Sequence, residues 1–207
     1  MSLSIGFFVI QICMIVIFTT DNIIISNVLG PEEVTNYDII FKLFQVIITF
    51  STILLDPFWS LFTDAYQKKD FLWIKKTLKK LNKLFIIVCI ATIVLILLTK
   101  DIVSIWIGKD FIVKESLPYL MGLFVLIRIY PLMYMYFLNS IGKIKLQMYL
   151  YIIGAVINIP ISIFFVKYFN LGISGVILGT SVSIISMLIL LPIQTHRILK
   201  RDLILNN

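Results

Sequence analysis

The 207-residue chain is 60% hydrophobic and only 14% charged, and its mean hydropathy is +1.03. Soluble domains are usually about 25% charged, so the composition excludes an ordinary soluble domain with a water-exposed surface. The formal net charge of +7 sits in short clusters between apolar runs, which favours membrane topology over nucleic-acid binding. A bilayer supplies an apolar surrounding, so we predict an all-α integral membrane protein.

Six stretches are long and apolar enough to cross a bilayer as helices, for which about 20 residues are needed. They cover residues 3–28, 37–63, 84–99, 117–140, 146–166 and 172–195. The third stretch is short, and residues 102–107 are expected to extend it at the interface. The sequence therefore predicts a single six-span lobe over residues 1–207.

Lysine and arginine are unevenly distributed among the connections. Twelve of the 18 lie between spans two and three, between spans four and five, and after span six. Four lie in the connections on the other side, and Lys42 and Arg128 lie within spans. The positive-inside rule places the richer side in the cytoplasm, so both termini are expected to be cytoplasmic.

Residues 64–83 have a periodic pattern of their own. Phe71, Ile74, Leu78 and Leu81 recur at steps of three or four, with lysines between them. The pattern predicts an amphipathic basic helix suited to the anionic surface of the cytoplasmic leaflet. The alternative is that the lysines only fix the topology, and the two interpretations are compatible.

Arg128 lies near the middle of the fourth span, too far from either end for its side chain to reach water easily. It must therefore face an interior partner or a water-filled cavity. Pro131 follows three residues later and is expected to loosen the helix and free backbone carbonyls. We expect Tyr130 and Tyr134 on an adjoining face, where aromatic side chains beside a cation suit a phosphate or sugar ligand.

Three further polar residues lie inside the first two spans. Asp21 and Asn22 could line a cavity, carry a coupling proton or bind a cation, or they could form an interhelical hydrogen-bonded pair that fixes packing. Asp56 precedes Pro57, and the pair predicts a bend in the second span. An ion pair of Arg128 with Asp21 or Asp56 is the alternative to ligand contact.

Lys42 and Asn158 complete the candidate substrate-binding residues. Lys42 lies one to two turns inside the outer end of the second span, where it either snorkels to the interface or attracts an anionic substrate. Asn158 lies in the fifth span, two residues before Pro160. Small residues at steps of three or four in the last span predict close helix packing: Gly172, Gly175, Gly179 and Ser183.

The sequence contains no constellation of an enzyme. It has one histidine, no glycine-rich phosphate loop and no spacing of metal ligands, and Cys13 and Cys89 both lie in apolar runs. We therefore expect no catalytic residue, no metal site and no cofactor, apart from a coupling proton or cation.

Four groups of residues, in this order, resemble the oligosaccharide-lipid flippases, which translocate O-antigen and capsule repeat units. They lie at residues 21–30, 56–70, 139–147 and 158–176. The matched motifs are the Asp21-Asn22 run that ends at Gly30, the run from Asp56 to Trp59, and Asn158-Ile159-Pro160. The resemblance covers nearly the whole chain, and it places the chain in the multidrug/oligosaccharidyl-lipid/polysaccharide exporter superfamily.

The resemblance implies the second six-helix lobe of a two-lobed, MATE-like transporter, with the N-terminal lobe absent from this chain. It implies flipping of an undecaprenyl-pyrophosphate-linked oligosaccharide across the bacterial cytoplasmic membrane for polysaccharide biosynthesis. The partners would be the bilayer, the lipid-linked oligosaccharide and the missing lobe or partner half, with no nucleic acid.

The same resemblance suggests roles for individual residues. Arg128, with Lys42, would contact the pyrophosphate or a sugar carboxylate, and Asp21 or Asp56 would serve any ion coupling. Two alternatives remain open at the level of sequence. One is a small-molecule or drug exporter on the same fold, and the other is a non-transporting membrane scaffold or truncated gene product.

Overall fold

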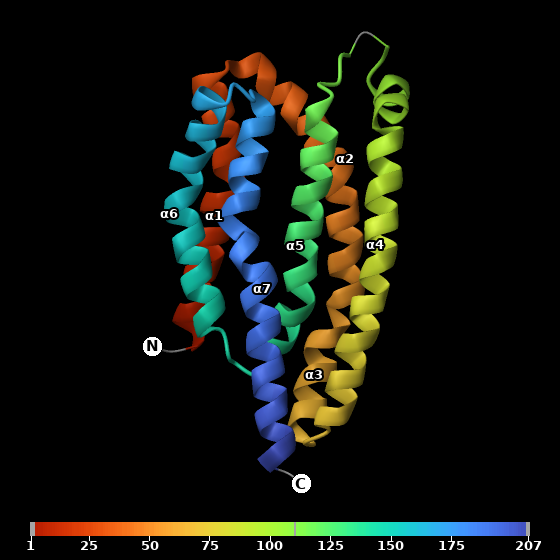
Figure 1. Cartoon of the computed structure of the whole chain (residues 1–207), viewed down its shortest axis with the longest axis vertical. Helices are drawn as coiled ribbons and strands as arrows, with labels where there is room; N and C mark the ends of the chain where they lie inside the picture. The colour runs from red at the N-terminus through yellow and green to blue at the C-terminus, as the bar shows by residue number, and fades with distance from the viewer. Residues whose placement is uncertain (1–2, 110, 206–207) are drawn as a thin grey trace.

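The computed structural model describes residues 3–109 and 111–205, and these residues form a bundle of helices without strands (Figure 1). The helices are α1 (Leu3–Val28), α2 (Pro31–Leu55), α3 (Pro57–Gln67), α4 (Phe71–Trp106), α5 (Ser116–Ser140), α6 (Lys145–Tyr168) and α7 (Ile173–Leu205). Six stretches within the described residues are long and apolar enough to cross a membrane, and α2 and α3 together make one of them. This agrees with the six spans expected from the sequence.

The helices differ in how much of their apolar surface the protein itself covers. In the most apolar window of α5, 67% of the residues are buried, whereas the corresponding share is 11% in α4 and 17% in α1. α7 packs along both α5 and α6, and α1 packs against α6. The centre of the lobe is therefore formed by α5 and α7, while α4 presents a broad apolar surface that suits lipid.

The second span bends where the sequence predicts it. α2 ends at Leu55 and α3 begins at Pro57, with Asp56 between them. Proline has no amide hydrogen, so Pro57 cannot donate to the carbonyl of Ile53. The amide of Asp56 still donates to Thr52 O at 2.9 Å, and helical bonding resumes beyond the bend.

Residues 64–83, which the sequence predicts as an amphipathic basic segment, are divided between two helices in the structure. Residues 64–67 end α3, residues 68–70 form the turn that follows, and residues 71–83 are the first part of α4. The apolar stripe is covered by protein, since Ile74 is fully buried and Leu78 and Leu81 are 5% and 4% exposed. Periodicity indicated the helix and its apolar face correctly, but it cannot tell whether lipid or protein covers that face.

α6 and α7 approach closely at small residues, as the stripe in the last span predicts. A Cβ atom added at Gly179 would lie 2.6 Å from Ser162 Cα, and one added at Gly154 would lie 2.8 Å from Ser183 O. Both distances are shorter than a real Cβ contact, so these positions require glycine at the present helix separation.

The two ends of the bundle differ in charge. The α3–α4 turn, the α5–α6 turn and the last turns of α7 lie together at the lower end in Figure 1, and we call this the basic end. It carries lysines and arginines from all three segments: Lys68, Lys69, Lys75, Lys76, Lys79, Lys143, Lys145, Arg197, Lys200 and Arg201. The α1–α2, α4–α5 and α6–α7 connections form the opposite end.

Candidate substrate and coupling site

A buried polar network joins four helices inside the lobe. The carboxylate of Asp21 on α1 accepts hydrogen bonds from the Tyr37 hydroxyl on α2 at 2.6 Å and from Thr180 Oγ1 on α7 at 2.7 Å. Asn158 on α6 donates through Nδ2 to Thr180 Oγ1 at 3.0 Å, and Thr20 Oγ1 donates to Asn158 Oδ1 at 3.0 Å. None of Asp21, Tyr37, Asn158 and Thr180 is more than 3% exposed.

The network satisfies polar groups that would otherwise be costly in an apolar slab. An unpaired buried hydroxyl or amide costs about 1–3 kcal/mol, and a buried charge costs more. Here each carboxylate oxygen of Asp21 has a hydroxyl donor. The interhelical hydrogen-bonding role that the sequence left open for Asp21 is therefore present in the structure, and it includes Asn158.

Asn22 faces a different partner from its neighbour Asp21. Its Nδ2 donates to Asp38 Oδ1 at 3.0 Å, which links α1 to α2 a second time. Its Oδ1 is buried and has no hydrogen-bond partner among the described residues. An amide oxygen is a hard ligand of the kind that small cations prefer.

Arg128 is surrounded by aromatic rings. Its guanidinium carbon lies 4.1 Å from the ring centroid of Phe18 on α1 and 5.8 Å from that of Phe124 on its own helix. Phe124 also packs against Phe41 of α2, with ring centroids 6.3 Å apart. Cation–π contacts of this kind stabilise an arginine by about 0.5–2 kcal/mol without neutralising its charge.

The ion pair proposed as an alternative for Arg128 is not formed. Within the described residues no carboxylate lies at ion-pair distance from Arg128, and the four ion pairs there involve other residues. Asp21 is bound to hydroxyl groups, and Asp56 accepts a hydrogen bond from Tyr136. Arg128 therefore remains a cation without a carboxylate partner in the middle of α5.

Tyr130 and Tyr134 do not share the surroundings of Arg128, which corrects the expectation from the sequence. Tyr134 exchanges hydrogen bonds with the amide of Asn82 on α4, at 2.8 and 3.0 Å. Tyr130 packs edge-on against Phe85 of α4, with ring centroids 5.1 Å apart. At about 100° per residue, positions two and six beyond Arg128 are turned roughly 200° and 240° from it. The two tyrosines thus face α4.

The remaining predicted residues lie on or near the surface of the lobe. Lys42 is exposed on α2 and has no ion-pair partner among the described residues. Asp56 is exposed at the bend, beside Tyr136 of α5. Trp59 packs between Phe7 and Tyr136, with centroid distances of 5.8 and 6.3 Å. Neither Lys42 nor Asp56 touches the network around Asp21.

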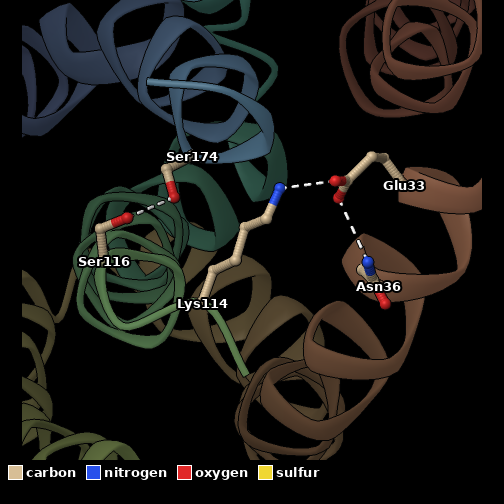
Figure 2. A network of polar contacts seen from close by, with 5 residues as sticks. All are labelled: Glu33, Asn36, Lys114, Ser116 and Ser174. Carbon is tan, nitrogen blue, oxygen red and sulfur yellow. Dashed lines mark hydrogen bonds and ion pairs between the residues drawn. The ribbon is translucent and has the colours of Figure 1, made fainter. Parts of the chain in front are cut away.

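The opposite end of the lobe is held by a smaller polar cluster. Figure 2 shows Lys114, just before α5, bound to Glu33 Oε1 at 2.6 Å, while Asn36 donates to the other oxygen of Glu33 at 3.2 Å. Ser116 and Ser174 share a hydrogen bond of 2.8 Å. These contacts tie the start of α2 to the α4–α5 loop, and the start of α5 to the start of α7.

Sequence reasoning missed several members of these groups, above all Tyr37 and Thr180. Thr180 follows Gly179 in the small-residue stripe, so the sequence already predicted that this part of the last span packs against another helix. Tyr37 lies near the end of a span, where a tyrosine usually indicates an interfacial residue and not a buried hydrogen-bond donor. No group of three or more acidic, histidine or cysteine side chains suited to a metal occurs in the described part of the chain.

The fold and its polar interior define a multi-span α-helical membrane protein. The MatE family matches residues 7–164, and the chain belongs to this family. Two solved structures share the fold over 96% of this chain and 44% of their own. One is an outward-facing multidrug resistance MATE family transporter of the MOP superfamily, with a TM-score of 0.75 and 16% identity. The other is a MATE protein that carries a point mutation, with a TM-score of 0.76 and 15% identity.

Two bacterial relatives are named for O-antigen export. A Salmonella typhimurium protein that is named for O-antigen transport is 30% identical over 192 residues, which is 87% of this chain and 42% of that protein. A Yersinia pseudotuberculosis protein that is named for O-antigen export is 33% identical over 142 residues, which is 68% of this chain and 32% of that protein. The chain therefore spans less than half the length of these relatives.

Proposed function

We propose that this chain is the second lobe of a transporter that flips a lipid-linked oligosaccharide across the bacterial cytoplasmic membrane. Support comes from membership of the MatE family and from two relatives named for O-antigen export. The coverage of 44% of the solved transporters fits one lobe of a two-lobed protein. A second lobe, on the same polypeptide or on a partner, would complete the cavity.

The proposal rests mainly on the charge of Arg128, which is unpaired among the described residues. A guanidinium in the middle of a membrane span is costly unless an anion or water reaches it, and no described carboxylate does. Its planar fork suits bidentate contact with phosphate or carboxylate oxygens. The lipid-linked substrate carries such groups in its pyrophosphate. We place the pyrophosphate or a sugar carboxylate at Arg128, between α1, α2 and α5.

Lys42 and Asn158 take supporting roles in this proposal. Lys42 is exposed on α2, and its charge would attract the anionic headgroup toward the cavity. Asn158 is fully buried in the Asp21 network. Its role would therefore be indirect: it would keep the four helices in position around the substrate site without touching the substrate. Tyr130 and Tyr134, which face α4, are not part of the proposed Arg128 site.

Ion coupling is assigned to the α1–α2 region. Asp21 holds α1, α2 and α7 together, so adding a proton there would change the contacts of three helices at once. Asn22 Oδ1 and Asp38 offer oxygen ligands to a cation. Asp56 would act through Tyr136 at the bend. No other cofactor is required.

Surface glycan, dye efflux and the effect of replacing Arg128 together distinguish the proposed flippase from a small-molecule exporter and from a membrane scaffold. In cells that use the intact transporter containing this lobe, loss of the protein is expected to abolish surface glycan and to accumulate lipid-linked oligosaccharide. A small-molecule exporter, which the fold of the solved relatives also allows, would instead show lost efflux of a cationic dye with glycan unchanged. A scaffold would lose glycan while tolerating replacement of Arg128. Either result would contradict the proposal.

A further inference from the structure

A groove of about 700 Å³ opens between α4 and α7 at the basic end of the lobe. Five polar side chains line it: Lys75, Lys79 and Asn82 from α4, and His196 and Lys200 from α7. Its other lining residues are leucines and an isoleucine, and no acidic residue of the described chain lines it. The groove is separate from Arg128, which faces α1 and Phe124.

The lysines of the groove carry uncompensated charge. Lys75, Lys79 and Lys200 are all exposed, and none forms an ion pair with a described residue. Lys75 and Lys79 are one helical turn apart on the same face of α4, where like charges repel. Lys200 adds a third cation from the facing helix. An anion in the groove would relieve this repulsion and contact ammonium groups from both helices.

The floor of the groove is already fixed by hydrogen bonds. Both polar atoms of the Asn82 amide are engaged by the Tyr134 hydroxyl. The His196 ring lies 6.3 Å from the Tyr134 ring, and its Nδ1 donates to Pro192 O at 2.7 Å. A ligand would therefore meet a preorganised polar floor with exposed lysines at its rim, which reduces the ordering cost of binding.

The position of the groove along α4 identifies the kind of anion. The next turns of α4 expose large apolar side chains on the same face as Lys79, with Ile86, Ile90 and Ile93 each more than half exposed. The groove thus lies where the basic end meets the apolar belt of the lobe. A molecule with its phosphate among the lysines would continue along an apolar helix surface, as a phospholipid does.

We propose that the α4–α7 groove binds the phosphate headgroup of an anionic membrane phospholipid, with the acyl chains lying along α4. Lys75, Lys79 and Lys200 contact the headgroup, and Asn82 and His196 form the floor. Binding ties α4, which the protein itself covers least, to the central helix α7. The proposal does not depend on the substrate of the transporter.

Lipid binding to the purified chain tests this directly. The probe is phosphatidylglycerol, added to delipidated protein in detergent and counted by native mass spectrometry, with phosphatidylcholine for comparison. The groove variant is Lys75→Gln/Lys79→Gln/Lys200→Gln. The matched control is Lys76→Gln/Lys80→Gln/Lys83→Gln, which removes the same charge from α4 outside the groove. All six lysines are exposed, so both variants are expected to melt as the parent does.

The groove variant is expected to bind phosphatidylglycerol at least about tenfold more weakly, and the control no more than about twofold. Equal weakening in both variants would overturn the proposal, because overall charge would then hold the lipid. So would unchanged binding in the groove variant. Glycerol 3-phosphate that bound as tightly as the phospholipid would overturn the lipid assignment in favour of a soluble phosphate. If the triple variants fold poorly, Lys79→Gln against Lys80→Gln repeats the comparison.

Discussion

The hydroxyl of Thr180 lies 2.7 Å from the carboxylate of Asp21, although the two residues are 159 positions apart in the chain. The contact joins the first and last helices of the lobe. Asn158 and Tyr37 extend it to α6 and α2. Protonation or substitution of Asp21 would therefore change hydrogen bonds to the helices that frame the proposed substrate site and to the core helix α7.

Substitutions at Asp21 should separate its structural role from a coupling role. Asp21→Asn keeps a polar group of the same shape beside Tyr37 and Thr180. Asp21→Leu leaves both hydroxyls without an acceptor, at about 1–3 kcal/mol for each group. We expect the leucine variant to unfold at a clearly lower temperature in detergent than the asparagine variant.

If Asp21 also couples transport, Asp21→Asn will fold and insert normally while transport of lipid-linked oligosaccharide falls. Near-normal transport by this variant would assign Asp21 to packing alone. The measurement pairs a thermal melt with an assay of surface glycan in cells that produce the intact transporter.

Tyr134→Phe should affect stability and leave transport nearly unchanged. The substitution removes the hydroxyl that Asn82 binds at 2.8 Å and leaves the ring in place, on the side of α5 that faces α4. A loss of about 1 kcal/mol in unfolding free energy is expected. A strong transport defect in a stable Tyr134→Phe protein would contradict this prediction and would indicate that Tyr134 contacts the substrate.

Gly179→Leu should separate α6 from α7. Even a Cβ at this position would lie 2.6 Å from Ser162 Cα, so the larger side chain cannot fit without moving a helix. Overpacking of this kind costs about 1–3 kcal/mol. Val156→Leu on α6 is the control, since Val156 is 70% exposed. Equal melting temperatures for the two variants would contradict the observed helix separation.

The ion pair between Glu33 and Lys114 should contribute little on its own. Both side chains are partly exposed, and exposed pairs contribute about 0.2–1 kcal/mol. We expect Glu33→Gln and Lys114→Gln to destabilise the protein slightly and non-additively, with a coupling energy within this range in a double-mutant cycle. A coupling energy well above it would show that the pair is a principal restraint on this end of the lobe.

The spans were predictable from sequence because a bilayer imposes a length and an apolar composition on every crossing helix. The break at Asp56–Pro57 followed from the missing amide of proline. Asp21 and Asn158 were singled out because polarity is costly inside a span. Their partner Tyr37 was not, since pairing between helices depends on rotations and offsets that one sequence does not encode locally.

For two features the sequence indicated the local structure but not its surroundings. Tyr130 and Tyr134 were expected on a face adjoining Arg128, but the turn of the helix directs them to α4. The apolar stripe of residues 71–81 was expected to be helical, and in the structure protein covers that stripe. In both cases the contact partner depends on how neighbouring helices pack, which the local pattern does not reveal.

Replacement of Arg128 tests the central claim most directly. In cells that depend on the intact transporter, Arg128→Ala is expected to abolish surface glycan while the protein still reaches the membrane. Arg128→Lys should retain most of the activity if charge alone is needed. It should lose much of the activity if two-point contact with phosphate is needed, because lysine lacks the planar fork of arginine. Normal surface glycan in cells producing Arg128→Ala at the parental level would contradict the account.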